Sequence, residues 1–299
     1  MTSQLYLDHF GFSRRPFSVL PDPAMLCWTP DHRRAFAVLE YGLMTHAPLI
    51  VVTGEVGTGK TTLIQTLLTR IGPESRVGLI SNARGDRGDL LRWVLNALDV
   101  PHDPRADYVA LFQAFQDYVV AQYAAGRRVV LIIDEAQNLG LDVLEELRML
   151  TNINSGSDEL LQIILLGQPE LRDLITCPDL RQFAQRVAAT YHLGPMPAET
   201  TADYIRHRLR TAGGSGEEFT PAAIARIHAE AGGIPRLVNK ICDLALVYAS
   251  ADDRRTVGPE LIGELIADGL ILRPGPDRPP GQVTPLTLNP QDRIKRDRT

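Results

Sequence analysis

The sequence predicts a three-layer α/β fold with a five-stranded parallel sheet, followed by a smaller all-helical domain. Up to about residue 195, short apolar runs alternate with helical periodicity, as expected for parallel strands joined by crossover helices. A glycine-rich loop follows the first apolar run and precedes an amphipathic helix. After Gly194-Pro-Met-Pro only helical patterns remain, so the class of structure changes at this linker.

Each expected element is short and bounded by turn or capping residues. The five expected strands are Leu49–Thr53, Val77–Ser81, Val129–Ile133, Leu160–Leu166 and Val187–Leu193. Helical periodicity in the same region fits His32–Met44, Lys60–Arg70, Asp89–Leu98, Asp107–Tyr123, Leu141–Thr151 and Leu180–Arg186. Four further helices are expected after the linker, at Thr200–Thr211, Pro221–Ala231, Pro235–Ala249 and Gly258–Asp268.

These patterns divide the chain into four parts. Residues 1–47 form an N-terminal segment and a helix that packs on the core, and residues 48–195 form the α/β core. Residues 196–271 form an α-helical lid. Residues 272–299 are rich in proline and carry scattered arginines, so we expect a disordered basic tail.

The glycine-rich loop from Gly54 to Thr61 matches the pattern G-x-x-x-x-G-K-[ST]. Backbone N–H groups of such a loop surround phosphates, Lys60 reaches the β and γ phosphates, and the Thr61 hydroxyl binds Mg²⁺. The flanking strand and helix disfavour a glycine-rich turn that fits the pattern by chance. The expected nucleotide-binding residues are Gly54, Glu55, Val56, Gly57, Thr58, Gly59, Lys60, Thr61 and Thr62.

Two carboxylates, Asp134 and Glu135, directly follow the apolar run that ends at Ile133. In a doubly wound sheet, ligands bind beyond the carboxyl ends of the strands, so Asp134 arrives beside the phosphate loop and binds Mg²⁺ with Thr61. Glu135 is then placed to orient or deprotonate the attacking water. Either acid alone would suit a solvated loop, but the pair at this position predicts hydrolysis as well as binding.

Composition agrees with a soluble intracellular enzyme. The 299 residues carry a formal net charge of −5, which argues against a protein coated with nucleic acid. The three cysteines show neither a disulfide framework nor metal-ligand spacing. No signal peptide and no run of eighteen apolar residues is present, so we expect a cytoplasmic location.

Further motifs along the chain are Tyr6-Leu-Asp-His-Phe10-Gly-Phe12, Pro16-Phe17, Pro21-Asp22-Pro23, His32, Tyr41-Gly42-Leu43, Asp134-Glu-Ala-Gln-Asn-Leu139, Gly167-Gln-Pro-Glu-Leu171 and Gln185-Arg186-Val. With these motifs and the phosphate-binding loop, the chain resembles the AAA+ ATPases, and its opening motifs are similar to those of the general secretion pathway protein A (ExeA-like) ATPases. TnsC and TniB transposition ATPases are more distantly similar. The resemblance implies ATP as the nucleotide, Mg²⁺, and a homo-oligomeric ring or filament.

Two polar residues follow expected strands and are candidates for controlling the attacking water. Gln168 could reach the γ phosphate and the water beside Glu135, and the resemblance implies the sensor 1 role; an ordinary Gly-Gln-Pro turn is the alternative. Asn82 matches the position of a residue that restrains the catalytic glutamate in many AAA+ proteins. A turn-capping asparagine is the alternative there.

Three arginines are candidates for contacting nucleotide phosphates. Arg236 lies in the first turn of an expected lid helix, where a cation opposes the helix dipole unless an anion balances it, and the resemblance implies sensor 2. A surface arginine is the alternative. Arg186 and Arg181 flank the helix from which an AAA+ subunit inserts an arginine finger into its neighbour; we favour Arg186, with a salt-bridged helix residue as the alternative.

Two functions remain open. The first is an ATPase that drives assembly or regulation of a cell-envelope secretion or exopolysaccharide-type system through a protein client. The second is a DNA-dependent ATPase of the transposition type, supported by the arginines of the loop Asn82-Ala-Arg84-Gly-Asp-Arg87-Gly-Asp89. The two aspartates of that loop argue for a solvated loop instead. A nucleotide-binding scaffold without turnover is disfavoured because the catalytic motifs are intact.

Overall fold

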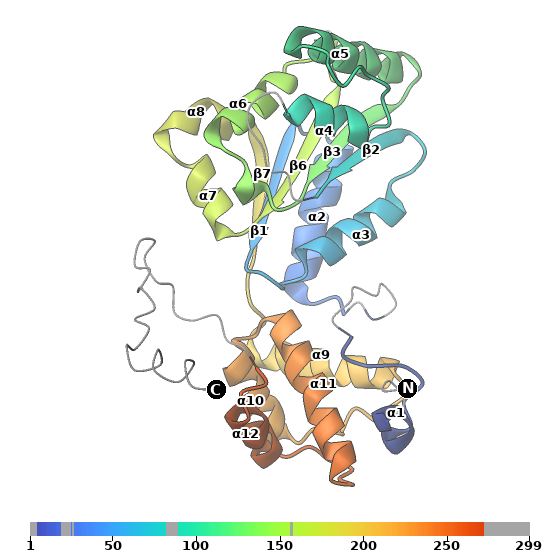
Figure 1. Cartoon of the computed structure of the whole chain (residues 1–299), viewed down its shortest axis with the longest axis vertical. Helices are drawn as coiled ribbons and strands as arrows, with labels where there is room; N and C mark the ends of the chain where they lie inside the picture. Colours follow the sequence, from blue (N-terminus) through green and yellow to red (C-terminus); the bar gives the residue numbers. More distant parts are fainter. Residues whose placement is uncertain (1–4, 19–24, 26, 82–88, 156–157, 272–299) are drawn as a thin grey trace, which may run out of the picture.

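A five-stranded parallel sheet organises the first two thirds of the chain, with strand order β2-β3-β6-β1-β7 (Figure 1). The computed structural model describes residues 5–18, 25, 27–81, 89–155 and 158–271. The five-stranded parallel sheet, with its helices and the all-helical part that follows, confirms the predicted fold class. The strands are β1 (Leu49–Gly54), β2 (Ser75–Ile80), β3 (Arg128–Ile133), β6 (Leu161–Gly167) and β7 (Val187–Leu193).

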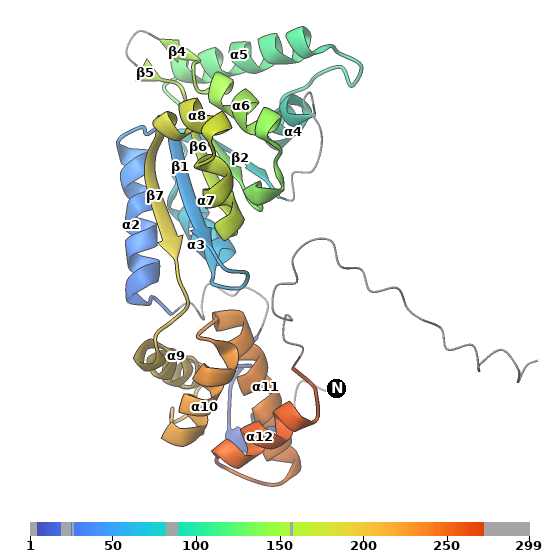
Figure 2. The same ribbon diagram turned by 90° about the vertical axis from the view of Figure 1, so that its left-hand side faces the viewer.

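Helices cover both faces of this sheet, as Figure 2 shows with α2 on one side and α6 and α7 on the other. Two groups of helices cover the two faces. Because side chains of a strand alternate between faces, Ile50 and Val52 of β1 pack against one group, and Leu49 and Val51 pack against the other. Ile50 and Val52 contact the group given first below. The first group is α2 (Pro30–Met44) and α3 (Lys60–Arg70). The second is α4 (Leu90–Ala97), α5 (Tyr108–Ala124), α6 (Leu141–Leu150), α7 (Pro169–Ile175) and α8 (Arg181–Arg186).

Four helices form the lid below the sheet: α9 (Ala198–Thr211), α10 (Pro221–Ala231), α11 (Pro235–Ala251) and α12 (Pro259–Ala267). Proline at the first position of α10, α11 and α12 suits a helix start, because its missing N–H would have no intrahelical partner. The turn before α11 is anchored to the linker from the sheet, since Met196 N–H donates to the Gly233 carbonyl at 2.9 Å. The four helices share an apolar cluster that is separate from the two clusters around the sheet, and it also includes residues of the N-terminal segment.

The structure differs from the sequence prediction in several elements. It adds α1 (Leu5–Phe10) and α7, and a small antiparallel hairpin of β4 (Asn154–Ser155) and β5 (Asp158–Glu159). Short helical turns are also present at Ala136–Asn138 and Pro178–Leu180. Such short elements contain too few residues to show a hydrophobic period.

The described N-terminal residues, for which we expected a segment and a helix that packs on the core, contact two different apolar clusters. Helix α2 covers the sheet. In contrast, Tyr6, Phe12 and Phe17 are buried in the apolar cluster formed with the lid helices α9 to α12. Phe17 contacts Phe219 edge to face, with ring centroids 6.0 Å apart. The reason is that these aromatic side chains find their apolar partners on α9 to α12. The expected tail, 272–299, lies outside the described residues.

Candidate nucleotide-binding site

The phosphate-binding loop joins the end of β1 to the start of α3, and its backbone requires glycine at three positions. Gly57 and Gly59 have φ of 86° and 105°, a region that L side chains rarely adopt. A Cβ on Gly54 would lie 2.5 Å from the Leu193 carbonyl oxygen of β7. These glycines let the loop curl tightly between the sheet and the lid, so their spacing follows from packing as well as from ligand binding.

Lys60 is buried in this loop and donates to the loop's own carbonyls, at 2.6 Å from Gly54 O and 3.0 Å from Glu55 O. Burial lowers the pKa of the ammonium, and the carboxylates of Glu135 and Asp134 act in the opposite direction. The lysine is thus held at the mouth of the loop, where a phosphate oxygen can replace a carbonyl as the acceptor.

Thr61 and Asp134 lie together although 73 residues separate them, with Thr61 Oγ1 donating to Asp134 Oδ2 at 3.2 Å. The other carboxylate oxygen, Oδ1, accepts from the Glu135 N–H at 2.9 Å, which fixes the orientation of the side chain. A hydroxyl and a carboxylate are hard oxygen donors, and Mg²⁺ is commonly held by one or two such groups together with water and phosphate. The donors of this chain therefore fit Mg²⁺.

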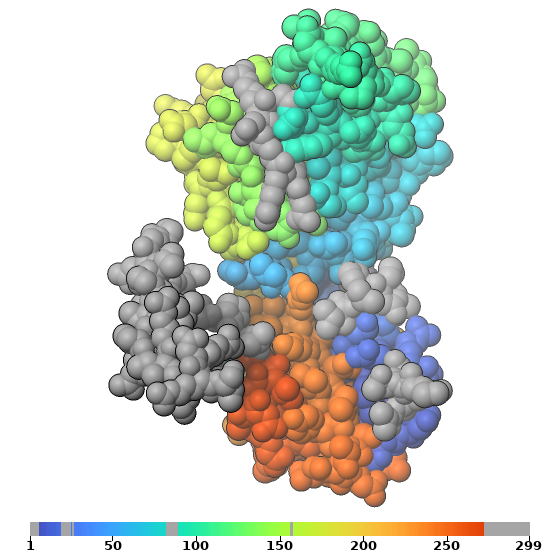
Figure 3. Space-filling view, viewed as in Figure 1, coloured from blue at the N-terminus to red at the C-terminus, as the bar shows by residue number. Residues whose placement is uncertain are grey.

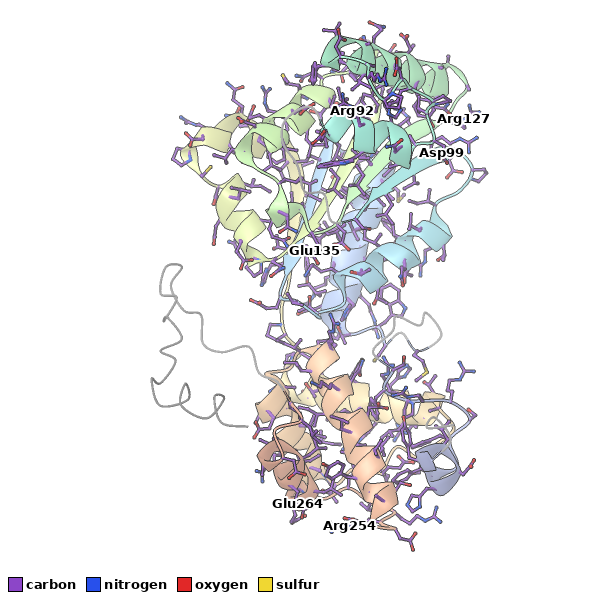
Figure 4. The ribbon with its side chains drawn as sticks, viewed as in Figure 1. Arg92, Asp99, Arg127, Glu135, Arg254 and Glu264 are labelled. Carbon is purple, nitrogen blue, oxygen red and sulfur yellow. The ribbon has the colours of Figure 1, made fainter. Side chains whose placement is uncertain are left out.

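Glu135 lies at the carboxyl edge of the sheet, the edge nearer the lid in Figure 4, and lines the cavity described below. Its backbone is left-handed, with φ 56° and ψ 38°. This conformation is uncommon for a residue other than glycine and is found more often at functional sites. Its Oε2 accepts from Gln168 Nε2 at 3.2 Å and from Gln137 Nε2 at 2.5 Å. Two amides therefore aim a single carboxylate.

Gln137 is a site residue that the sequence analysis missed. While its Nε2 contacts Glu135, its Oε1 accepts from the Gln168 N–H at 3.0 Å. It thus connects the acid after β3 to the polar residue after β6. The available signal was its position two residues beyond Glu135, in a single helical turn that brings the side chain back over the carboxylate.

Gln168 lies where the sequence analysis expected it, beside Glu135 at the carboxyl edge of the sheet. It precedes Pro169, the first residue of α7, so the segment interpreted as a possible turn begins a helix. Asn82, the other candidate for controlling Glu135, lies outside the described residues, as do Arg84 and Arg87.

A cavity of about 370 Å³ lies between the loop and the lid. In Figure 3 the molecule narrows between the α/β part and the lid, where the lining residues from the phosphate loop and α11 come together. Arg236 lines it from the first turn of α11, and its backbone N–H donates to the Gly57 carbonyl at 3.2 Å. Farther from the loop the lining includes Met25, Cys27, Tyr204, Arg208 and Asn239. The sequence analysis did not identify these five residues as site residues. The N-terminal segment and the lid are far apart in the sequence, and only the folded structure brings them together.

Arg186 is not part of this cavity. It precedes β7, whose first residue, Val187, pairs with Leu49 at the start of β1. The phosphate loop follows the opposite end of β1. Since each strand residue adds about 3.3 Å, the two ends of β1 lie about 20 Å apart. Arg186 Nη1 instead lies 3.2 Å from Glu159 Oε1, and Nη2 donates to Asn152 Oδ1. Arg181 is exposed at the start of α8.

The fold and this site define the chain as an AAA+ ATPase. A family model described as an AAA domain matches residues 43–175. General secretion pathway protein A of Aeromonas hydrophila is 43% identical over 247 residues, which are 83% of this chain and 45% of that protein. The chain belongs to the family of AAA+ ATPases related to general secretion pathway protein A, and it spans less than half the length of this relative.

Solved structures show the same fold at low sequence identity. The Aeropyrum pernix ORC2 protein, in ADPNP-ADP complexes, superposes with a TM-score of 0.58 at 17% identity, covering 86% of this chain and 72% of that chain. Drosophila ORC bound to DNA gives 0.62 at 16% identity, covering 91% and 67%. Within the described part of the chain, every helix is too short or too polar to cross a membrane.

Proposed function

We propose that this ATPase binds ATP with Mg²⁺ and hydrolyses it at the cavity between the loop and the lid. The observation that carries the proposal is the convergence of Lys60, the Thr61–Asp134 pair and Glu135 at one edge of the sheet. These are the groups that phosphoryl transfer to water requires: a phosphate cradle, oxygen donors for the metal and an acceptor for a proton of water.

Each residue has a distinct role in the proposed reaction. The loop N–H groups and Lys60 bind the phosphates, while Thr61 and Asp134 hold the metal. Bound Mg²⁺ supplies positive charge that balances the charge of the phosphates. Glu135 accepts a hydrogen bond from the attacking water and orients it. Gln168 restrains Glu135, and Arg236 adds positive charge from the lid.

We further propose that the site is completed by an arginine of a second copy of the chain. Arg186 lies too far from its own phosphate loop to contact the nucleotide there, at the opposite end of β1 and β7. A finger contributed between subunits neutralises charge on the transferred phosphoryl group and accelerates hydrolysis by orders of magnitude. A homo-oligomer, as a ring or filament, is the assembly that this role requires.

The biological role that we propose is the assembly or regulation of a cell-envelope secretion or exopolysaccharide-type system through a protein client. Its support is the 43% identity to general secretion pathway protein A. We place this activity in the cytoplasm, where ATP is available. The alternative is a DNA-dependent regulatory ATPase. Its supporting loop lies outside the described residues, and the likeness to ORC bound to DNA concerns the fold alone.

The proposal is tested by measuring ATP turnover of the purified chain with and without Mg²⁺, and with and without duplex DNA. Turnover that requires Mg²⁺ and is lost in Lys60→Ala, together with its nucleotide affinity, supports the proposed chemistry. Unchanged affinity in Lys60→Ala would contradict it. Stimulation of wild-type turnover by duplex DNA would favour the DNA-dependent alternative.

A further inference from the structure

His32 contacts the phosphate-binding loop from outside it. The residue lies in the first turn of α2, 26 positions before Thr58, and only 7% of its surface is exposed. Its Nε2 lies 3.0 Å from the Thr58 carbonyl oxygen. Because a carbonyl only accepts hydrogen bonds, Nε2 carries the proton and donates it.

The cap of α2 fixes this tautomer of the imidazole. Nδ1 of His32 lies 2.6 Å from Thr29 Oγ1, and the same oxygen accepts from the His32 backbone N–H at 3.3 Å. Since Oγ1 accepts from the backbone, its own proton is available for Nδ1. The N-cap residue therefore leaves the neutral ring with its one N–H directed at the loop.

This hydrogen bond orients a peptide unit of the loop. The Thr58 carbonyl and the Gly59 N–H belong to one planar trans peptide, so they point in opposite directions. Anchoring the carbonyl to His32 directs the Gly59 N–H to the other side, as needed for a phosphate. A Cβ on Gly59 would lie 2.7 Å from His32 Nε2, so the close approach depends on glycine.

The preceding peptide unit is held from the lid. The Gly57 carbonyl accepts from the Arg236 N–H at 3.2 Å, so consecutive carbonyls of the loop are anchored to α11 and to α2. A loop that is already ordered loses less conformational entropy when the ligand binds, which strengthens binding without any new contact to the ligand.

We propose that His32 is a positioning residue that holds the phosphate-binding loop in its phosphate-receiving conformation. The inference rests on the proposed nucleotide binding. His32 acts through the Thr58–Gly59 peptide and not by contact with phosphate. Without its donor, the Thr58 carbonyl would lose this hydrogen bond, and the Thr58–Gly59 peptide would be held less firmly.

Two replacements separate the hydrogen bond from the packing of the ring. His32→Phe keeps a planar ring but has no donor, whereas His32→Gln keeps an amide N–H that can reach the carbonyl. Affinity for ADP with Mg²⁺ is measured by calorimetry on the full chain, because ADP avoids turnover. We expect His32→Phe to weaken binding about tenfold or more, and His32→Gln to stay within about threefold. His207→Phe, an exposed histidine on α9, is the matched control and should bind as wild type.

Wild-type affinity in folded His32→Phe would overturn the proposal, as would equal losses in the Phe and Gln variants. If His32→Phe does not fold, as judged by circular dichroism, Thr29→Val tests the same hydrogen-bond chain with Thr29→Ser as control. Weaker ADP binding in the valine variant alone supports the proposal, and equal binding overturns it. A folded wild-type chain that binds no ADP would instead refute the proposed function.

Discussion

The amide of Gln137 donates to Glu135 Oε2 across 2.5 Å, and Gln168 donates to the same oxygen at 3.2 Å. The proposed base is therefore oriented by two neutral amide donors. Gln137 also holds the Gln168 backbone through its Oε1. A change sensed by Gln168 at the nucleotide would thus be transmitted to the carboxylate through two paths.

Removing the Gln137 amide should lower turnover while sparing nucleotide binding. In Gln137→Leu the Glu135 carboxylate loses its shorter hydrogen bond and its orientation, so we expect turnover to fall by about ten- to a hundredfold. Affinity for ADP should change less than about threefold. The control is Gln113→Leu, an exposed glutamine on α5 whose amide donates to Asp117. Steady-state ATP hydrolysis measured beside calorimetry distinguishes the two effects, and wild-type turnover in Gln137→Leu would contradict the positioning role.

Replacement of the base itself should be more severe. Glu135→Gln removes the carboxylate that orients water but leaves Thr61 and Asp134 in place, so ATP should bind as in wild type. Turnover should fall by about two or more orders of magnitude. Single-turnover hydrolysis checks this step without a contribution from product release. A variant that turns over ATP at nearly the wild-type rate would remove Glu135 from the mechanism.

The part of the site that follows the carboxyl ends of the strands could be predicted from the sequence, because the order of the strands determines which residues come together. Thr61 and Asp134 follow the carboxyl ends of two parallel strands, and such ends share one edge of a sheet, so their meeting was predictable across 73 residues. His32 was noted only as part of a family motif. Its contact with Thr58 depends on how α2 packs on the sheet, and no local periodicity encodes that packing.

The same limit applies to the fold. The central strands β1, β3 and β6 were predictable because continuous apolar runs are typical of strands buried on both faces. Helix α7 was missed because Gly-Gln-Pro before it is also typical of a turn, and the helix that Pro169 begins has only seven residues. Arg236 was predicted on the lid side of the cavity, but the other lining residues there were missed because they come from the N-terminal segment, α9 and α11 and meet only in the fold.

Stability should depend on pH through His32. Burial lowers the pKa of His32 below its ordinary value of 6.5, while its hydrogen bond to Thr58 and the charge of Asp31 act in the opposite direction. The unfolded chain therefore takes up the proton first as the pH falls, and the contribution of the neutral ring to stability, present above pH 6.5, is lost. We expect the difference in urea midpoint between wild type and His32→Gln to decrease from pH 7.5 to about pH 5. Groups that titrate equally in both proteins cancel in this difference. A difference independent of pH would show that His32 keeps an ordinary pKa.

The last prediction concerns Arg186, which pairs with Glu159 within its own chain. If it serves a neighbouring subunit, Arg186→Ala should bind ATP normally and hydrolyse it poorly, and wild-type activity per chain should rise with protein concentration. Glu159→Gln is the matched control, because it breaks the same ion pair and leaves the arginine available. Mixing Arg186→Ala with Glu135→Gln should restore partial activity, since some interfaces then combine an intact Glu135 with an intact Arg186. If Glu159→Gln and Arg186→Ala lose stability and activity alike, and mixing restores nothing, then Arg186 is a structural residue that holds the start of β7 to the hairpin of β4 and β5.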